Sequence, residues 1–174
     1  MNAPLLLPVF ALGSCLATVA WAKDDPGKDF PMRLILQACV STYAHASRVA
    51  AQSRQMGLAE ITGDSAARYL SGHAGRVWSG ENDSGAFAVS LLRGGACTVF
   101  VHKGDAERIR QGFESWLPPA DSGITIAREH LQSPPGLTST AYTMRGGKVR
   151  EMWVLTIASA PDSPMRAIIS YHGQ

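Results

Sequence analysis

The chain has 174 residues, of which 45% are hydrophobic and 17% are charged. This length and composition are typical of one globular domain with a sizeable core, and they argue against a disordered tail. The formal net charge of only +2 produces no strong field, so the composition gives no indication of binding to nucleic acid or to an anionic membrane.

The N-terminal region differs from the rest of the chain. Residues 5–22 contain no charged side chain and end in Ala20-Trp21-Ala22, after which Lys23 follows at once. Small residues at these two alanine positions are what a signal peptidase reads. We therefore expect a cleaved signal peptide over 1–22, a flexible leader over 23–31 and a periplasmic location, although no Lys or Arg precedes the apolar run.

Two alternatives to cleavage remain open. The sequence Leu12-Gly13-Ser14-Cys15 allows a lipoprotein signal, which would anchor the chain through Cys15, but the apolar run continues for seven residues past this cysteine. An uncleaved membrane anchor is the other alternative, and 18 residues near Pro4 and Pro8 are marginal for a span. We expect no transmembrane segment after signal cleavage.

The cysteines indicate a disulfide. Cleavage removes Cys15 and leaves Cys39 and Cys97, and an even pair in an oxidising compartment most often forms a bridge. The bridge would close a loop of 97 − 39 = 58 residues, which stabilises the fold by about 4 kcal/mol in the chain-entropy model. The alternative is two buried thiols, and the absence of Cys-x-x-Cys argues against a redox-active pair.

The first third of the domain is predicted to be helical. Over 32–56, apolar residues recur at spacings of three and four, which predicts one long helix that ends before Gly57. A shorter helix is expected over 65–71, and the segment after Val77-Trp78, residues 79–85, is rich in turn-forming residues. The apolar face of the long helix comprises Leu36, Cys39, Tyr43, Ala46 and Ala50.

The centre of the chain predicts a hairpin and a third helix. Two β-rich runs, 86–92 and 96–102, are joined through Gly94-Gly95, which favours a hairpin. Asp105 can cap the helix that follows, and Pro118-Pro119 ends it. Its apolar stripe is Ile109, Phe113, Trp116 and Leu117.

The last third predicts a meander of four strands separated by turns rich in Gly and Pro. With the earlier elements, the order is ααββαββββ. This order favours a single α+β domain over 32–174, in which an antiparallel sheet of about six strands carries helices on one face. The four strands are expected over 123–131, 137–145, 148–158 and 165–172.

We find no motif for metal binding or catalysis. No two histidines stand at a metal-ligand spacing, and Gly-x-Ser-x-Gly is absent. Gly94-Gly95 and Gly146-Gly147 each join two strands, so they predict hairpin turns rather than a phosphate-binding loop. We predict no cofactor, no metal site and no catalytic residue, and we expect the protein not to be an enzyme. The histidines are His45, His73, His102, His130 and His172.

Two places could bind a partner or ligand. Trp78 lies beside the turn-rich segment and is the first aromatic residue that we consider for binding, whereas Trp116 and Trp153 fit the core. The turn that contains Arg145, Lys148 and Arg150 carries three positive charges and could contact an acidic partner. The alternative for this turn is an ordinary solvated loop.

The cysteine pattern also carries a resemblance. Cys39 lies on an early helix, Gly94-Gly95-Ala96-Cys97 leads into a strand, and residues 113–116 place a tryptophan on the third helix. In these scaffold features the chain resembles small exported proteins of Gram-negative bacteria with one helix-to-strand disulfide. The resemblance implies a periplasmic location and no catalytic role.

From these observations we expect an exported protein that binds another envelope protein or a small ligand. The alternatives are a periplasmic hydrolase with a dispersed Ser/His/Glu site and an envelope lipoprotein anchored through Cys15.

Overall fold

The computed structural model describes residues 30–173. The predicted signal peptide, Cys15 and nearly all of the leader lie outside these residues. Within them, the chain forms one antiparallel sheet of eight strands in the order β1-β2-β3-β4-β8-β7-β6-β5. The α+β class with one antiparallel sheet is confirmed, but the sheet has eight strands rather than about six. The strands are β1 (Ala59–Ile61), β2 (Gly75–Asn82), β3 (Gly85–Leu92), β4 (Cys97–Val101), β5 (Thr125–Leu131), β6 (Leu137–Gly146), β7 (Val149–Ala158) and β8 (Ala167–Gly173).

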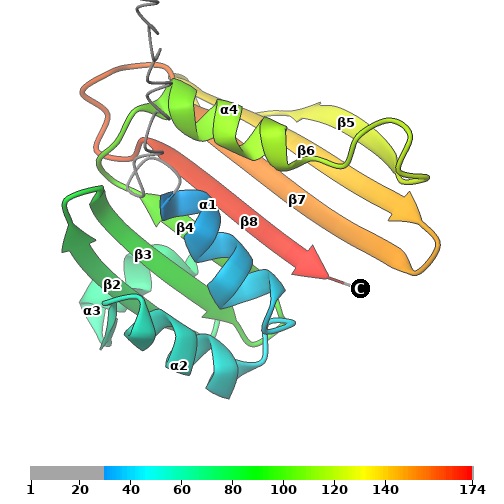
Figure 1. Cartoon of the computed structure of the whole chain (residues 1–174). Coiled ribbons are helices and arrows are strands. Elements are labelled where there is room, and N and C mark those ends of the chain that lie inside the picture. The colour runs from blue at the N-terminus through cyan, green and yellow to red at the C-terminus, as the bar shows by residue number, and fades with distance from the viewer. Residues whose placement is uncertain (1–29, 174) are drawn as a thin grey trace, which may run out of the picture.

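Two strands that are distant in sequence pair with each other in the middle of the sheet. Strand β4 pairs with β8, and the meander from β5 to β8 fills the rest of the sheet. Because β5 lies at the far edge, the chain must cross the sheet between β4 and β5, and helix α4 (Ala106–Trp116) makes that crossing (Figure 1). Its N-cap forms as predicted, since Asp105 accepts hydrogen bonds from the backbone N–H groups of Glu107 and Arg108.

Helices lie on both faces of the sheet, which corrects the expectation of one helical face. Helix α1 (Phe30–Leu34), the π-helix η1 (Ile35–Val40), helix α2 (Ala46–Gln55) and α4 lie on the front face in Figure 1, and α3 (Asp64–Leu70) lies behind β2. The side chain of Tyr69 on α3 packs in a small separate core with Val77 and Ala88. These two strand residues point away from the main core because side chains alternate along a strand.

The predicted single helix over 32–56 is broken. The hydroxyl of Ser41 donates to the carbonyl of Gln37, and the hydroxyl of Thr42 donates to that of Ala38, each at 2.7 Å. Such side-chain bonds offer the backbone an alternative to continuing the helix. Tyr43 and Ala44 then take left-handed backbone angles, with φ of 51° and 53°, and α2 starts in a new direction.

Strands β1 and β2 account for the difference in strand number. All eight residues of β2 pair with β3, although Ser79, Gly80 and Asn82 read as turn formers. Gly80 instead allows the backbone at Gly57 to lie close to the strand, because a Cβ atom at position 80 would lie only 2.8 Å from the carbonyl oxygen of Gly57. The glycine thus lets the connection from α2 pass over the strand.

The predicted disulfide is confirmed. Cys39 in η1 and Cys97 at the start of β4 are joined, with Cα atoms 5.7 Å apart and both side chains fully buried. The bridge fastens the N-terminal helical segment to the centre of the sheet. Around it lies the main core, whose largest fully buried side chains include Trp153, Phe87, Phe113, Leu34, Ile35 and Ile169.

Candidate functional site

On one face of the sheet, the half formed by β4, β8, β7 and β6 has no helix packed over it among the described elements. On the face opposite to α4, helix α3 packs over β2 and β3 and reaches β4 at Phe100. The strand registers place one face of β4, β8, β7 and β6 beyond it. We call this surface the open sheet face. It comprises Thr98, Ile168, Ser170, His172, Met152, Val154, Thr156, Ser139, Ala141 and Thr143.

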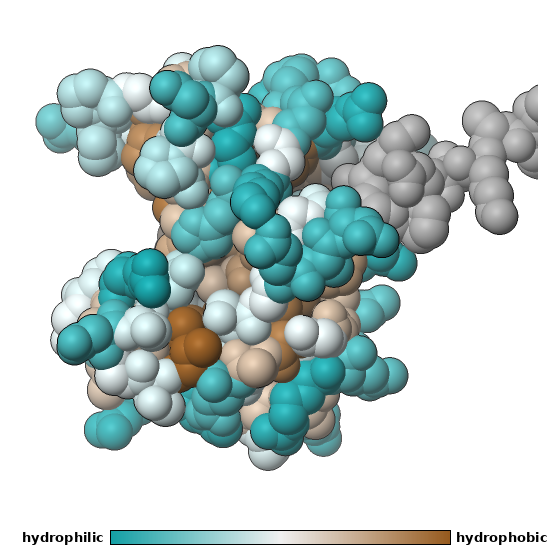
Figure 2. Space-filling model, turned by 90° about the vertical axis from the view of Figure 1, so that its left-hand side faces the viewer, coloured by the Kyte–Doolittle hydropathy of each residue, from teal (hydrophilic) through white to brown (hydrophobic). Residues whose placement is uncertain are grey.

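Over these four strands the open sheet face carries no Asp, Glu, Lys or Arg, and Glu129 of the edge strand β5 lies at its margin, opposite Ala141. Its hydroxyl groups bind each other in cross-strand pairs, since the Thr98 and Ser170 hydroxyls lie 3.0 Å apart and those of Ser139 and Thr156 lie 2.8 Å apart. Met152 projects from it and is 42% exposed. The left-hand side of Figure 2 is the back of the sheet in Figure 1, and the surface there is hollowed between two lobes with hydrophobic residues beside the hollow. The surface therefore carries no charge over these strands, and four of its hydroxyl groups already have a hydrogen-bond partner within the sheet.

The three predicted basic residues lie together at one end of this face. Strands β6 and β7 turn at Gly147-Lys148, and Arg145 pairs directly with Arg150 across the hairpin. Arg145, Lys148 and Arg150 are all exposed, and none forms an ion pair with a described residue. Like charges directly opposite each other destabilise a strand pair. The hairpin therefore carries an unneutralised cationic tip.

Trp78 lies elsewhere and is not accessible. Its side chain is fully buried on the face of β2 that belongs to the main core, and its Nε1–H has no hydrogen-bond partner in the described part of the chain. The Arg76 guanidinium lies over the indole ring, 5.0 Å from its centroid. In this arrangement a ligand would meet Arg76 rather than Trp78, which differs from the expected exposed aromatic residue.

Arg76 is held in place by Glu60. Its Nε and Nη2 atoms donate to the two carboxylate oxygens of Glu60 at 2.8 and 2.7 Å. These hydrogen bonds lower the pKa of Glu60 below its ordinary value and raise the pKa of Arg76. The pair joins β1 to β2 and fixes the position of the guanidinium over Trp78.

A hydrolase site would need a histidine beside a serine, but His102 and His130 contact other residues. The His102 ring lies 2.9 Å from the Tyr69 hydroxyl through Nε2 and 3.0 Å from the Pro164 carbonyl oxygen through Nδ1. His130 contacts Thr140 at 3.3 Å. Within residues 30–173, no group of three or more His, Cys, Asp or Glu side chains is placed to hold a metal ion. The alternative of a dispersed hydrolase site stays a hypothesis.

Aromatic residues gather under α4 and belong to the core. Trp153 stacks at centroid distances of 4.7 Å from Trp116 and 4.9 Å from Tyr171, and its Nε1 donates to Glu151 at 3.0 Å. Burial, with a smaller contribution from Glu151, raises the pKa of Tyr171 to about 12. This cluster anchors α4 to the sheet.

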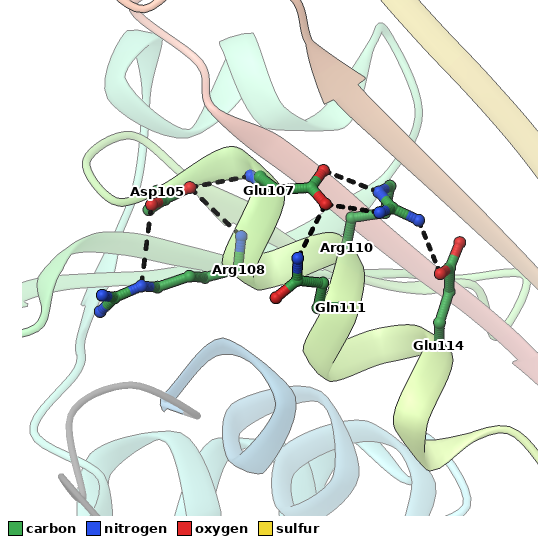
Figure 3. Close-up of polar contacts among 6 residues, drawn as sticks. All are labelled: Asp105, Glu107, Arg108, Arg110, Gln111 and Glu114. Carbon is green, nitrogen blue, oxygen red and sulfur yellow. Dashed lines mark hydrogen bonds and ion pairs between the residues drawn. The ribbon is translucent and has the colours of Figure 1, made fainter.

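The outer surface of α4 carries a chain of charges. Arg110 donates to Glu107 and to Glu114, and Gln111 donates to Glu107 (Figure 3). These hydrogen bonds, that of Arg110 first, lower the pKa of Glu107 to about 2. Opposite charges at spacings of three and four support the exposed helix, so this network is a structural feature of α4 rather than a site with free charge.

Comparison with protein-family models finds no match, and neither the curated proteins nor the solved structures provide one. Within the described part of the chain, no helix is long and apolar enough to cross a membrane.

Proposed function

We propose that this protein is an exported, non-catalytic interaction domain that binds another protein of the cell envelope through the open sheet face. The observation that carries the proposal is the neutral surface over four neighbouring strands that ends in an unneutralised pair of arginines. Charged residues are depleted in the centre of protein–protein interfaces and tolerated at the rim. The open sheet face and the hairpin tip have this distribution.

The chemistry of the hairpin tip specifies the partner further. Arg145 and Arg150 face each other across β6 and β7 without a described counter-ion, which lowers the stability of the isolated domain. A carboxylate placed between them would remove the repulsion, because each guanidinium can bind a carboxylate with two parallel hydrogen bonds. We therefore expect a partner with an apolar, uncharged centre and an acidic rim.

The periplasmic location is part of the same proposal. It rests on the uncharged run over 5–22 and on Ala20-Trp21-Ala22 before Lys23. Intact-mass measurement of exported protein tests it. A mass that begins at Lys23 supports the location, whereas a mass that retains Cys15 with attached lipid would replace it with the lipoprotein alternative.

The interface can be tested by site-specific photo-crosslinking in the intact cell envelope. A photoreactive residue at Val154, in the centre of the open sheet face, is compared with one at Ser47, which is exposed on α2. We expect a discrete crosslinked partner from position 154 and none of the same mass from position 47. The captured protein is identified by mass spectrometry, purified and titrated with the native protein.

The purified pair then provides the quantitative test. Val154→Arg should weaken binding by about 100-fold, since an unpaired charge buried in an interface costs about 2–5 kcal/mol. Ser47→Arg is the matched control and should bind like the parent, and circular dichroism checks that both variants fold. Equal affinity of the two variants would refute the proposal. Crosslinking of position 154 to a second copy of the chain would replace the envelope partner by self-association.

A further inference from the structure

A cavity opens at the end of the sheet where β2 begins and β3 ends, on the side of α2. Its volume is about 430 Å³, and Ala44, His45, Arg76, Leu91 and Arg93 are among its lining residues. Volumes of roughly 300–1,000 Å³ are usual for small-molecule sites in proteins. The remaining residues of the wall are Ala46, Gly75, Leu92 and Gly95, so the lining includes no acidic side chain.

Two arginines give this cavity its charge. Arg76 uses Nε and Nη2 to bind Glu60, which leaves Nη1 without a hydrogen-bond partner among the described residues. Glu60 neutralises one positive charge of the pair. Arg93 makes no side-chain hydrogen bond or ion pair with another described residue, so its charge stays uncompensated. The balance at the cavity is therefore two arginines against one carboxylate, or one net positive charge.

The position of Arg76 is fixed before any ligand binds. Glu60 holds one edge of the guanidinium, and the Trp78 ring lies under its face at 5.0 Å. An arginine that is already ordered loses less conformational entropy when it binds a ligand. His45 adds a further polar group to the lining of the cavity.

The rest of the lining is apolar. Leu91, Ala44 and Ala46 offer aliphatic side chains, whereas the side chain of Leu92 alternates to the opposite face of β3. A compact and strongly hydrated dianion such as phosphate would leave this part of the wall unused, whereas a molecule with an apolar body and one anionic group would use both parts. One net positive charge likewise suits a monoanion.

We propose that this cavity binds a small organic monocarboxylate, with the carboxylate between Arg93 and the free Nη1 edge of Arg76 and the aliphatic body against Leu91. The site is independent of the interaction proposed for the open sheet face, because it lies at the α2 end of β2 and β3 and shares no residue with that face.

Titration calorimetry with three six-carbon probes tests the charge and the apolar body separately. Hexanoate should bind, whereas hexan-1-ol and hexylamine, which carry the same chain with a neutral or cationic head, should bind at least about tenfold more weakly, as expected for loss of a charge-assisted hydrogen bond. Inorganic phosphate should also bind more weakly than hexanoate. Equal binding of hexanol, or tighter binding of phosphate, would overturn the assignment.

Variants locate the binding. Arg93→Gln should weaken hexanoate binding by about tenfold or more, and Arg108→Gln, which alters an exposed arginine on α4, should leave it unchanged. Backbone amide shifts on adding hexanoate should concentrate at residues 44–46, 75–76 and 91–95. If Arg93→Gln binds like the parent, or if the shifts lie elsewhere, the proposal is wrong. Arg93 is exposed on a turn, so both variants should fold, which their thermal unfolding checks.

Discussion

The solvent exposure of Trp78 and of Tyr43 is the opposite of what the sequence pattern predicts. Tyr43 falls on the apolar face of the expected helix, yet it is 76% exposed because the helix ends before it. Trp78 precedes a polar segment, yet it is fully buried because that segment is a paired strand under α2. In both cases the predicted local structure is wrong, since the helix expected over 32–56 breaks at Tyr43 and the segment expected to turn after Trp78 is part of strand β2.

Trp116 provides a test at this scale. It is only half-buried, and it contacts Trp153 with ring centroids 4.7 Å apart. Because part of the indole stays in solvent, we expect Trp116→Ala to lower the free energy of unfolding by about 2 kcal/mol, less than the 3–5 kcal/mol of a fully buried tryptophan. Chemical denaturation measures this, with Trp153→Ala as the comparison at about 3–5 kcal/mol. Equal losses for the two variants would contradict the packing described for α4.

The raised pKa of Tyr171 predicts that the protein loses stability at alkaline pH. Burial, followed by the charge of Glu151, raises its pKa to about 12 from an ordinary value of 10.0. The folded state therefore keeps the phenol protonated where the unfolded state releases the proton. The stabilisation is complete below pH 10 and is lost as the pH rises from 10 to 12, by about 1.4 kcal/mol per pH unit.

Denaturation of the parent and of Tyr171→Phe between pH 7 and pH 12 measures this effect. Below pH 9 the difference in stability between the two proteins should not vary with pH. Above pH 10 the parent should lose stability more steeply than Tyr171→Phe. Parallel profiles through pH 12 would show that Tyr171 does not titrate differently in the two states.

Among the elements, the six expected strands are present and the turn at Gly94-Gly95 joins the expected pair. The turn between β6 and β7 lies at Gly147-Lys148, one residue after the predicted Gly146-Gly147, because Gly146 is still paired as the last residue of β6. The hydrophobic pattern does not predict on which face of the sheet each helix packs. Helix α3 follows the three-residue strand β1 and packs behind β2, and its apolar positions would fit either face equally well. Only the pairing of β2 with β3 directs Val77 and Ala88 towards it.

The β6–β7 hairpin makes a prediction in which stability and binding change in opposite directions. Arg150→Glu would place a carboxylate directly opposite Arg145 and replace repulsion by attraction. We expect the free energy of unfolding to rise by about 0.5–1 kcal/mol, while binding of an acidic partner weakens. Arg150→Gln is the control and should show about half of the gain. A fall in stability for Arg150→Glu would show that the two side chains do not repel each other in the native hairpin.

At the scale of the whole molecule, the disulfide joins the N-terminal helical segment to the centre of the sheet across 58 residues of sequence. Replacing both cysteines by alanine should lower the free energy of unfolding by about 4 kcal/mol in the chain-entropy model. That loss is comparable with the net stability of a small domain, so the double variant should be partly unfolded at growth temperature.

Two measurements check the disulfide. Alkylation of a denatured, unreduced protein that comprises residues 23–174 should label no thiol, and denaturant titration should show the loss in Cys39→Ala/Cys97→Ala. Two labelled thiols per chain would refute the bridge in the native protein. A double variant as stable as the parent would show that the bridge does not constrain the unfolded state.

Patterns in the sequence predicted the α+β class, the disulfide, the cap of α4 and the basic hairpin tip, because each depends on residues close in sequence or on a single pair of cysteines. Which surfaces are covered depends on how the elements pack. The register of β4 against β8 brings Thr98 beside Ser170 across 72 residues, and that pairing places the open sheet face beyond the reach of α3. The cavity at Arg76 and Arg93 arises in the same way, since α2, β2 and β3 meet there only after the sheet has formed. Periodicity reports which side of an element is apolar, but exposure depends on the partner that packs against it.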